Sequence, residues 1–396
     1  MNVLLYSHAF HPSTGGVETV SMQLAEGLAL RGIACKVVTR TPGDAETNHR
    51  FPVIRNPSKA RIKELVRWAD VVLFNGASLA LQPWVLLYRK PMIWVHTGYQ
   101  TTCIDGAGWT DGAPAPRTPW ASVMHQARRR GLGSAAREGL KLALRRFVAK
   151  RLVTRNVAIT RWMEEANPLP RQVQIYNPFP TRMFRQPSGE EPEFDFLFLG
   201  RLISEKGVDT LLKAFASLTF GKGAKPPTLL VIGDGPERAN LEGLAKSLGV
   251  PDRVKFVGNH TGESLVKQVA RGGIAVVPSS WAEPMGGVAV ELMAAGRNII
   301  VSKDGGLAEC VGDAGLTFPN GNAEALADVM TKVRNERIEQ WRPSARSLAR
   351  AKDFDPEPFI DRYVALLREI VRIPVPPAPA KRACELDGLS TDAMPL

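Results

Sequence analysis

Two carboxylates in an otherwise apolar, glycine-rich stretch are the first sign of chemistry in this chain. Residues 281–296 read WAEPMGGVAVELMAAG, with seven residues between Glu283 and Glu291. Burying a carboxylate costs several kcal/mol unless a partner compensates. A helical interval would place the two Cα atoms roughly 12 Å apart. Because that exceeds the ~5–9.5 Å between the carboxyl groups of a glycosidase pair, the two acids suit opposite ends of one long ligand.

Glycine-rich loops that each precede a helical pattern are the second sign. They are HAFHPSTGGVETV with Gly16, LGRLISEKGVDT with Arg201 and Lys206, VIGDGPER, and EPMGGVAVELMAAG with Gly286 and Gly287. Helix N-termini present free N–H groups to anions, and nearby cations add to that attraction. A single glycine turn is weak support because tight turns need glycine anyway. Four such loops in register, with cations in one, indicate a site for a phosphorylated ligand.

Alternating strand and helix patterns must position these loops. Strands are predicted at 2–7, 36–40, 71–75, 92–97, 157–160 and 173–177, and a second series at 194–200, 228–233, 254–258, 274–279 and 298–303. Continuous apolar strands separated by helices predict parallel sheets that are covered on both faces. The two series therefore predict two Rossmann-like, doubly wound domains. The Pro-, Gly- and charge-rich segment 177–193 is the expected linker between them.

Length, charge and cysteine usage bound the function. A chain of 396 residues favours two domains, and a net charge of +12 indicates an anionic partner: nucleic acid, a membrane surface or a phosphorylated small molecule. No apolar run reaches the ~18 residues of a membrane span, and the N-terminus does not resemble a signal peptide. The four cysteines form no C-x-x-C pair, as expected in a reducing cytosol. We therefore expect a cytoplasmic protein.

The segments GGVE, GRLISEKG, VIGDGP, VPSSWAEPMGGVAVELMAAG and SKDGGLAECV together resemble glycosyltransferase family 4, of the glycosyl transferases group 1. The resemblance implies a GT-B fold, with two Rossmann-like parallel-sheet domains facing a cleft and a C-terminal helix packing back toward the N-terminal domain. The domains implied are an acceptor-side domain at 1–178, a nucleotide-sugar-binding domain at 179–353 and a crossover helix at 354–371. A disordered tail at 372–396 is expected from its Pro/Ala composition.

The same resemblance assigns roles to the candidate residues. Glu283 would contact the donor sugar and Glu291 the ribose of a nucleotide, while His96 would lie over the transferred sugar. Donor-binding roles also fall on residues expected around the diphosphate: Gly16, Arg201, Lys206, Gly286 and Gly287. No cofactor or metal is expected, and Asp355 of the Asp-x-Asp at 353–355 is predicted to cap a helix rather than to bind metal.

The function implied is a retaining glycosyltransferase of the hexosyltransferase type, which moves a sugar from a nucleotide diphosphate-sugar to a saccharide or lipid-linked saccharide. Bacterial exopolysaccharide or lipopolysaccharide synthesis is the implied setting. A nucleotide-sugar epimerase or a sugar-phosphate synthase on the same fold is the alternative. A further alternative, a basic membrane- or nucleic-acid-binding module, fits the intact Glu-x7-Glu motif less well, and we expect no nucleic-acid partner.

The basic surplus is concentrated between residues 128 and 155, which hold ten Arg or Lys and one acid, Glu138. Apolar residues recur there at helical spacing: Leu140, Leu144, Phe147, Val148 and Leu152. Such a helix could lie on the inner face of an anionic membrane as a peripheral anchor. It could equally pack its apolar face into the N-terminal core. Loop aromatics such as Tyr99 and Trp109 could stack on acceptor sugars or simply pack.

Overall fold

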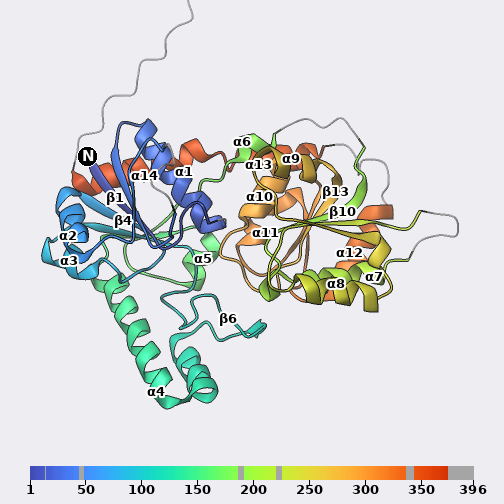
Figure 1. The fold of residues 1–396 in the computed structure, drawn as a ribbon, viewed down its shortest axis with the longest axis horizontal. Coiled ribbons are helices and arrows are strands. Elements are labelled where there is room, and N and C mark those ends of the chain that lie inside the picture. The colour runs from blue at the N-terminus through green and yellow to red at the C-terminus, as the bar shows by residue number, and fades with distance from the viewer. Residues whose placement is uncertain (14, 44–48, 186–190, 220–224, 336–342, 373–396) are drawn as a thin grey trace, which may run out of the picture.

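The computed structural model describes residues 1–13, 15–43, 49–185, 191–219, 225–335 and 343–372. Two parallel sheets, each covered by helices on both faces, lie side by side along the long axis of the molecule (Figure 1). We call the elements around them the first and second domains. The tail predicted to be disordered lies, except for Arg372, outside the described residues.

The first sheet has seven strands in the order β3-β2-β1-β4-β5-β8-β9. Their bounds are β1 Asn2–Ser7, β2 Ala34–Thr39, β3 Val53–Arg55, β4 Val71–Asn75, β5 Met92–His96, β8 Arg155–Ala158 and β9 Gln172–Gln174. One face packs against α1 (Gly16–Leu30) and α14 (Pro356–Val371). The other packs against α2 (Lys59–Trp68) and α3 (Gln82–Leu87). Burial on both faces explains the continuous apolar runs of these strands.

The second sheet has six strands in the order β12-β11-β10-β13-β14-β15. Their bounds are β10 Phe194–Leu199, β11 Leu229–Ile232, β12 Val254–Gly258, β13 Gly272–Val277, β14 Ile299–Ser302 and β15 Leu316–Phe318. One face is covered by α7 (Val208–Ala216), α8 (Arg238–Ser247) and α12 (Ala323–Asn335). The other is covered by α9 (Gly262–Ala270), α10 (Gly287–Ala294) and α11 (Gly306–Val311), with α13 (Ala345–Lys352) packed on α10.

Every predicted strand is present, and β1, β4 and β12 have the predicted bounds. The prediction missed the edge strands β3 and β15, each three residues long, because so short a run carries little periodicity. It also missed a small hairpin formed by β6 (Trp109–Thr110) and β7 (Ala113–Pro114). This hairpin projects from the first domain toward the second (Figure 1).

The last helix returns from the second domain to the first. α14 packs on α1, where a Cβ on Gly27 would lie 2.4 Å from Ile360, so glycine permits the close approach. Arg31 donates to the Glu357 carbonyl at 3.2 Å and pairs with Asp361 at 2.5 Å. This placement confirms the C-terminal helix packing implied by the family resemblance.

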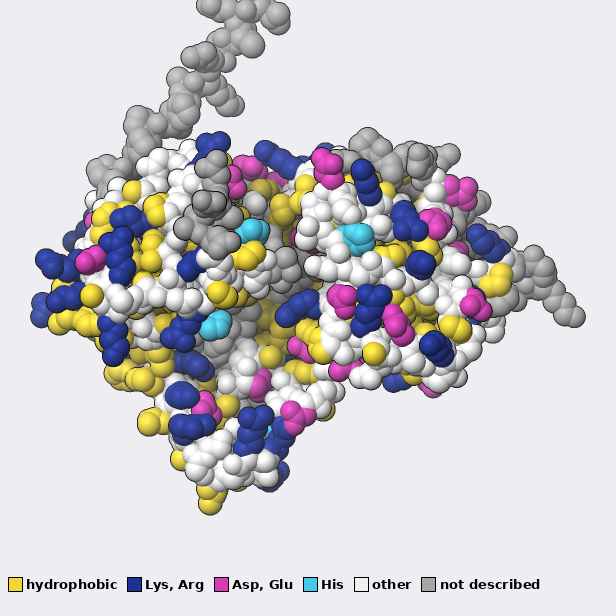
Figure 2. Space-filling model, in the orientation of Figure 1, with side chains coloured by type: hydrophobic (Ala, Val, Ile, Leu, Met, Phe, Trp, Pro, Cys, Tyr) yellow, Lys and Arg dark blue, Asp and Glu magenta, His cyan; other side chains and the backbone are white. Residues whose placement is uncertain are grey.

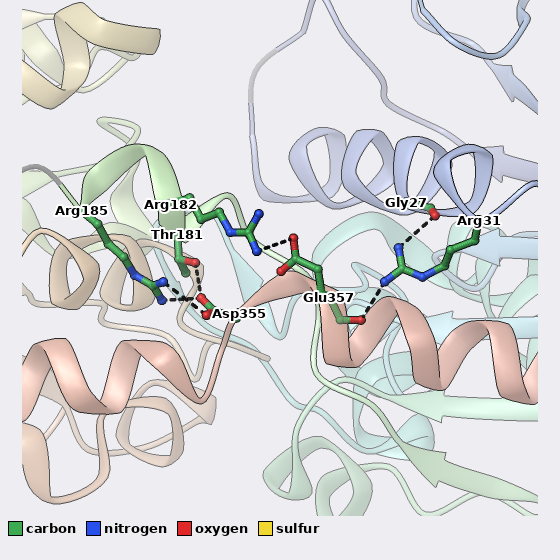
Figure 3. Close-up of polar contacts among 7 residues, drawn as sticks. All are labelled: Gly27, Arg31, Thr181, Arg182, Arg185, Asp355 and Glu357. Atoms are coloured by element: carbon green, nitrogen blue, oxygen red, sulfur yellow. Dashed lines mark hydrogen bonds and ion pairs between the residues drawn. The ribbon is translucent and has the colours of Figure 1, made fainter. Parts of the chain in front are cut away.

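Two passages of the chain between the domains are joined to each other (Figure 3). Asp355 accepts a hydrogen bond from Thr181 Oγ1 at 2.9 Å and pairs with Arg185. Arg182 pairs with Glu357 at 3.1 Å. Asp355 does precede α14 as predicted, but its side chain makes no capping hydrogen bond because it is committed to this contact. The carboxylate therefore links the two passages.

The basic segment forms a projecting arm. α4 (Pro119–Phe147) breaks at Gly131, where φ is 81°, and gives two helical pieces that stand out from the first domain (Figure 1). A π-helical turn, Val148–Leu152, then brings the chain back to the sheet. Within the described residues, no helix combines the length and apolarity needed to cross a membrane.

Candidate functional site

The carboxyl ends of β10 and β13 meet at the point where the strand order of the second sheet reverses. Open parallel sheets bind ligands at such points. The loop after β10 contains a 3-10 turn, Ser204–Lys206, and ends at Gly207 with φ 66°. A Cβ on Gly207 would lie 2.1 Å from the Pro278 carbonyl oxygen, so glycine is needed for the two loops to approach. This approach brings together the cationic loop and the Glu283 loop.

Lys206 and Glu283 form the centre of the site. Lys206 Nζ lies 2.7 Å from Glu283 Oε1, and the two side chains are 18% and 9% exposed. Ser279 Oγ donates a hydrogen bond to the same carboxylate oxygen. The Gly306 N–H donates to the Glu283 carbonyl at 2.6 Å, which fixes the backbone as well. A carboxylate held this way is fixed in orientation and nearly removed from solvent.

The interval between the two acids is only partly helical. Glu283 lies in a bridge with Gly305, and α10 begins at Gly287, so the 12 Å expected for a helical interval rests on a wrong assumption. Gly286 occupies the N-cap position. A Cβ on Gly287 would lie 2.4 Å from the ring of Phe179, which means that this glycine is required for packing. Packing and the start of the helix together explain the pair of glycines.

Glu291 lies one turn into α10 and is half-buried. Among the described residues, no hydrogen-bond or ion-pair partner reaches its carboxylate, and burial raises its pKa to about 7. A carboxylate that is costly to ionise and lacks a protein partner is more common at ligand sites than elsewhere. Its position on the helix that begins at Gly287 agrees with an acceptor for hydroxyl groups.

Arg201, in contrast, is exposed and forms no ion pair within the part of the chain described here. It follows β10 after Gly200, so it lies at the same edge of the sheet as the loop that carries Lys206. Gly16 of the first domain is the first residue of α1. A Cβ there would meet no described atom within 4 Å, which leaves open space beside the helix N-terminus.

His96 ends β5 rather than following it, and its side chain is fully buried. Its Nε2 lies 2.9 Å from Asn156 Oδ1. Because Asn156 Nδ2 donates to the carbonyls of Ala149 and Pro170, Oδ1 must accept, and Nε2 carries the proton. Burial lowers the pKa of His96 to about 4, so the ring is neutral. Nδ1 is left as an acceptor without a described partner. The structure does not bring this ring into contact with the Lys206–Glu283 pair.

A metal site is not formed by the described residues, among which no group of three or more His, Cys, Asp or Glu side chains could hold an ion. Cys103 is buried, and burial raises its pKa to about 12, which makes it a poor nucleophile. The candidate chemistry at this edge of the second sheet therefore rests on the Lys206–Glu283 pair and the side chains near it.

Comparison with known proteins identifies the second half of the chain. Residues 181–350 match the family described as glycosyl transferases group 1. The chain carries a group 1 glycosyltransferase domain. This group 1 domain contains every predicted donor-site residue except Gly16 and His96.

Relatives agree with this assignment. An uncharacterized glycosyltransferase of Methanocaldococcus jannaschii is 39% identical over 129 residues, which are 32% of this chain and 32% of that protein. The match thus spans about one third of the curated relative's length. HepE of Anabaena in complex with UDP-glucose has a TM-score of 0.72 at 19% identity, covering 93% of this chain and 100% of that one. WaaG, a glycosyltransferase involved in lipopolysaccharide biosynthesis, has a TM-score of 0.64 at 19% identity, covering 92% and 99%. The fold is therefore GT-B, as the resemblance implied.

The first domain holds the Glu283 loop of the group 1 domain from both sides. Tyr99 Oη donates to the Ala282 carbonyl at 2.7 Å, and Thr160 Oγ1 donates to the Pro284 carbonyl at 2.8 Å. The neighbours of Glu283 on either side are therefore bonded to the opposite domain. The arrangement of the two domains thus fixes where this carboxylate lies.

Glu309 of α11 makes a second link across the cleft. Its two carboxylate oxygens accept from the backbone N–H groups of Arg161 and Trp162 at 2.9 and 2.8 Å, at the start of α5 (Arg161–Ala166). Oε1 also accepts from Tyr176 Oη at 2.6 Å. A carboxylate at a helix N-terminus is favourable, and here it comes from the other domain.

Sequence reasoning missed these linking residues. Glu309 lies in the first turn of its own helix, where an acid is ordinary, so its spacing carries no signal. Tyr99 is predicted only as a loop aromatic that stacks on acceptor sugars or simply packs; it is buried at 1% exposure and its hydroxyl bonds to the Ala282 carbonyl. Its position three residues after His96, in the loop that leaves β5, is the only sequence feature that indicates a place near the site.

Proposed function

We propose that the chain is a retaining glycosyltransferase of family 4, which transfers a sugar from a nucleotide diphosphate-sugar to a hydroxyl of a saccharide or lipid-linked saccharide. The observation that carries this is the Lys206–Glu283 pair beside the N-terminus of α10, at 2.7 Å and almost removed from solvent. An ammonium, a free Arg201 and a helix N-terminus can receive a diphosphate, while Glu283 accepts sugar hydroxyls. HepE, which has the same fold, is known in complex with UDP-glucose.

The proposed reaction is a substitution on one face of the sugar. The acceptor oxygen forms a bond to the anomeric carbon as the bond from that carbon to the diphosphate oxygen breaks. The leaving diphosphate oxygen takes the acceptor's proton, so no carboxylate nucleophile is needed. Arg201, Lys206 and the α10 N-terminus stabilise the charge that develops on the diphosphate. We propose that these groups do so without a metal ion.

Within this scheme, Glu283 orients the sugar by accepting its hydroxyl hydrogen bonds. Glu291 binds the ribose. His96, neutral and held by Asn156, supplies at most an acceptor through Nδ1 toward the sugar. In this scheme none of these groups has to change its charge during transfer.

The test is a screen of UDP-, GDP- and ADP-sugars for slow hydrolysis, followed by variants of the diphosphate site. Arg201→Ala and Lys206→Ala should each lower turnover about 10²-fold, since lost stabilisation of developing charge costs on the order of 3 kcal/mol. Asp252→Asn, an exposed change in the same domain, is the control. Normal turnover in both site variants would refute the diphosphate site. A sugar epimer or a sugar phosphate as product would show the alternative reactions on this fold.

The projecting arm supports a peripheral place on a membrane. The alternative, in which its apolar face joins the core, is wrong for most of the helix: Leu132 is 81% and Leu140 is 72% exposed, and Leu144 and Phe147 are half exposed. With exposed Ala136, these residues recur every three or four positions and form one stripe. Figure 2 shows hydrophobic and basic side chains together on the arm. An apolar stripe flanked by cations suits an anionic lipid surface.

Vesicle sedimentation tests this placement. Vesicles containing phosphatidylglycerol should sediment the protein, and neutral phosphatidylcholine vesicles should not. Four exposed cations are suited to reversal: Arg128, Arg130, Arg137 and Lys141, of which the last two pair with the neighbouring Glu138 on the same helix. Each is worth up to ~1 kcal/mol at such a surface, so changing all four to Glu should release the protein. Equal sedimentation of wild type and variant would contradict the proposal.

The setting we propose is the assembly of bacterial cell-surface polysaccharide at the inner face of the cytoplasmic membrane. Two observations support it: the arm, which would bring the cleft to a lipid-linked acceptor, and the shared fold with WaaG, which acts in lipopolysaccharide biosynthesis. Transfer to acceptors extracted from bacterial membranes, compared with free disaccharides, is the direct measurement.

A further inference from the structure

A cavity adjoins the cationic loop that carries Lys206. It has a volume of about 510 Å³, within the range of small-molecule sites. Its floor comes from α7 and α8 of the group 1 domain, and its cover is the β6–β7 hairpin of the first domain. Ser204 and Ser280, which line it, belong to the two loops that carry Lys206 and Glu283. The cavity therefore adjoins the donor site without being part of it.

Trp109 fixes the hairpin over this cavity. Its Nε1 donates to Ser204 Oγ at 2.9 Å, and the position of a Cβ on Gly112 lies 4.0 Å from the Ser204 Cβ. The indole N–H is used in this contact, and the Trp109 side chain lines the cavity. The hairpin crosses from one domain to the other, so the cavity exists only when the two domains are together.

The charged part of the lining is mostly acidic. Asp209, Glu237 and Lys213 line the cavity, and Asp209 pairs with Lys213 at 2.9 Å. Apolar side chains, among them Pro114 and Leu241, complete the walls. Carboxylates accept hydrogen bonds from hydroxyl groups, while an indole face packs on apolar C–H surface. Two acids against one cation disfavour a phosphate or another anion.

We propose that this cavity is a saccharide subsite, which holds a neutral sugar unit of the acceptor remote from the one that reacts. The inference rests on the proposed function, because it supposes that the acceptor is a saccharide longer than one unit. Trp109 stacks on the C–H face of that unit, and Asp209 and Glu237 accept its hydroxyls. The subsite thus selects extended neutral glycans over monosaccharides.

The test is direct binding, which does not depend on transfer. Maltotetraose, cellotetraose, chitotetraose and mannotetraose are titrated into the full chain by calorimetry, each alone and with saturating UDP. We expect at least one to bind, and Trp109→Ala to weaken that binding at least tenfold. Trp109→Phe, which keeps a ring but loses the bond to Ser204, should retain most of it. The double change Asp209→Asn with Glu237→Gln should also weaken binding at least tenfold.

The control is Glu263→Gln with Asp328→Asn, the same change of charge at two exposed acids of the same domain. It should bind the tetrasaccharide as wild type does. Binding of UDP, GDP or ADP is measured for every variant and reports on the donor site separately. If no tetrasaccharide binds, if Trp109→Ala binds as wild type, or if a nucleotide displaces the sugar, the subsite is refuted. If the wild-type protein binds none of UDP, GDP and ADP, the proposed function is refuted instead.

Discussion

Glu291 gives a prediction that can be worked through from the structure. Its carboxylate lies on α10 without a described partner, and burial raises its pKa to about 7. If the ribose hydroxyls of the donor donate to this group, binding favours the ionised form. Donor binding should then weaken as the pH falls through 7, because the carboxyl group takes up a proton and loses acceptor capacity.

The size of the effect follows from that pKa. If only the ionised form binds, the observed dissociation constant is the intrinsic one multiplied by 1 + 10^(pKa − pH). With a pKa of about 7, the dissociation constant should be about tenfold larger at pH 6 than at pH 8, or ~1.4 kcal/mol. His96 does not contribute in this window, since its pKa is about 4.

The assay is titration with the nucleotide diphosphate-sugar identified by the hydrolysis screen, from pH 6 to pH 8. A diphosphate esterified at both ends has no group of its own that titrates in this range. Glu291→Gln should bind the donor more weakly by roughly 1.5–3 kcal/mol at pH 8, with no pH dependence from this position. A tenfold pH dependence that survives in Glu291→Gln, or a flat profile in the wild type, would refute the reasoning.

The raised pKa of Glu291 also makes the stability of the fold depend on pH. Because the folded value is raised above the ordinary 4.5, the unfolded chain loses this proton first as the pH rises. Glu291 therefore lowers the free energy of unfolding progressively between pH 4.5 and 7, by on the order of 2 kcal/mol for a half-buried group. Glu291→Gln should raise Tm at pH 8 and leave it unchanged at pH 4.

Three shorter predictions concern other parts of the site. Gly287→Ala should lower the free energy of unfolding by about 1–3 kcal/mol because its Cβ would meet the Phe179 ring. Gly16→Ala should leave Tm unchanged and weaken donor binding. An equal Tm for the two variants would contradict the packing described for Gly287. Tyr99→Phe should lower turnover while leaving nucleotide affinity unchanged, since the hydroxyl acts on the Ala282 carbonyl and not on the nucleotide; a matched loss of nucleotide affinity would argue against this. Treatment with EDTA should leave donor hydrolysis unchanged, and a loss restored by Mg²⁺ would overturn the metal-independent scheme.

Much of the fold could be predicted because buried parallel strands appear in the sequence as continuous apolar runs. VVLFN at 71–75, which is buried throughout, illustrates this. The glycine loops could be placed at strand ends for the same reason. The pairing of Lys206 with Glu283 could not, because it depends on how closely the loops after β10 and β13 approach, which Gly207 permits.

Periodicity also could not show which apolar faces are covered. The spacing of Leu140, Leu144 and Phe147 identifies a face, and only the tertiary structure shows that this face projects into solvent. Likewise, Glu309 and Asp355 resemble ordinary acids near helix starts. Their partners come from the opposite domain or from a distant passage of the chain, and no local pattern encodes such a contact.

The two joined passages between the domains have a mechanical consequence. A single polypeptide connection would let one domain swing and twist freely against the other. Here the passages at 181–185 and 355–357 are cross-linked by Asp355 and by the Arg182–Glu357 pair. Two linked connections side by side should allow the domains to bend about one axis and should resist twisting of one domain against the other. Every closing movement should therefore return the hairpin to Ser204 and Tyr99 to the Ala282 carbonyl, so the cleft reassembles in the same alignment from one turnover to the next.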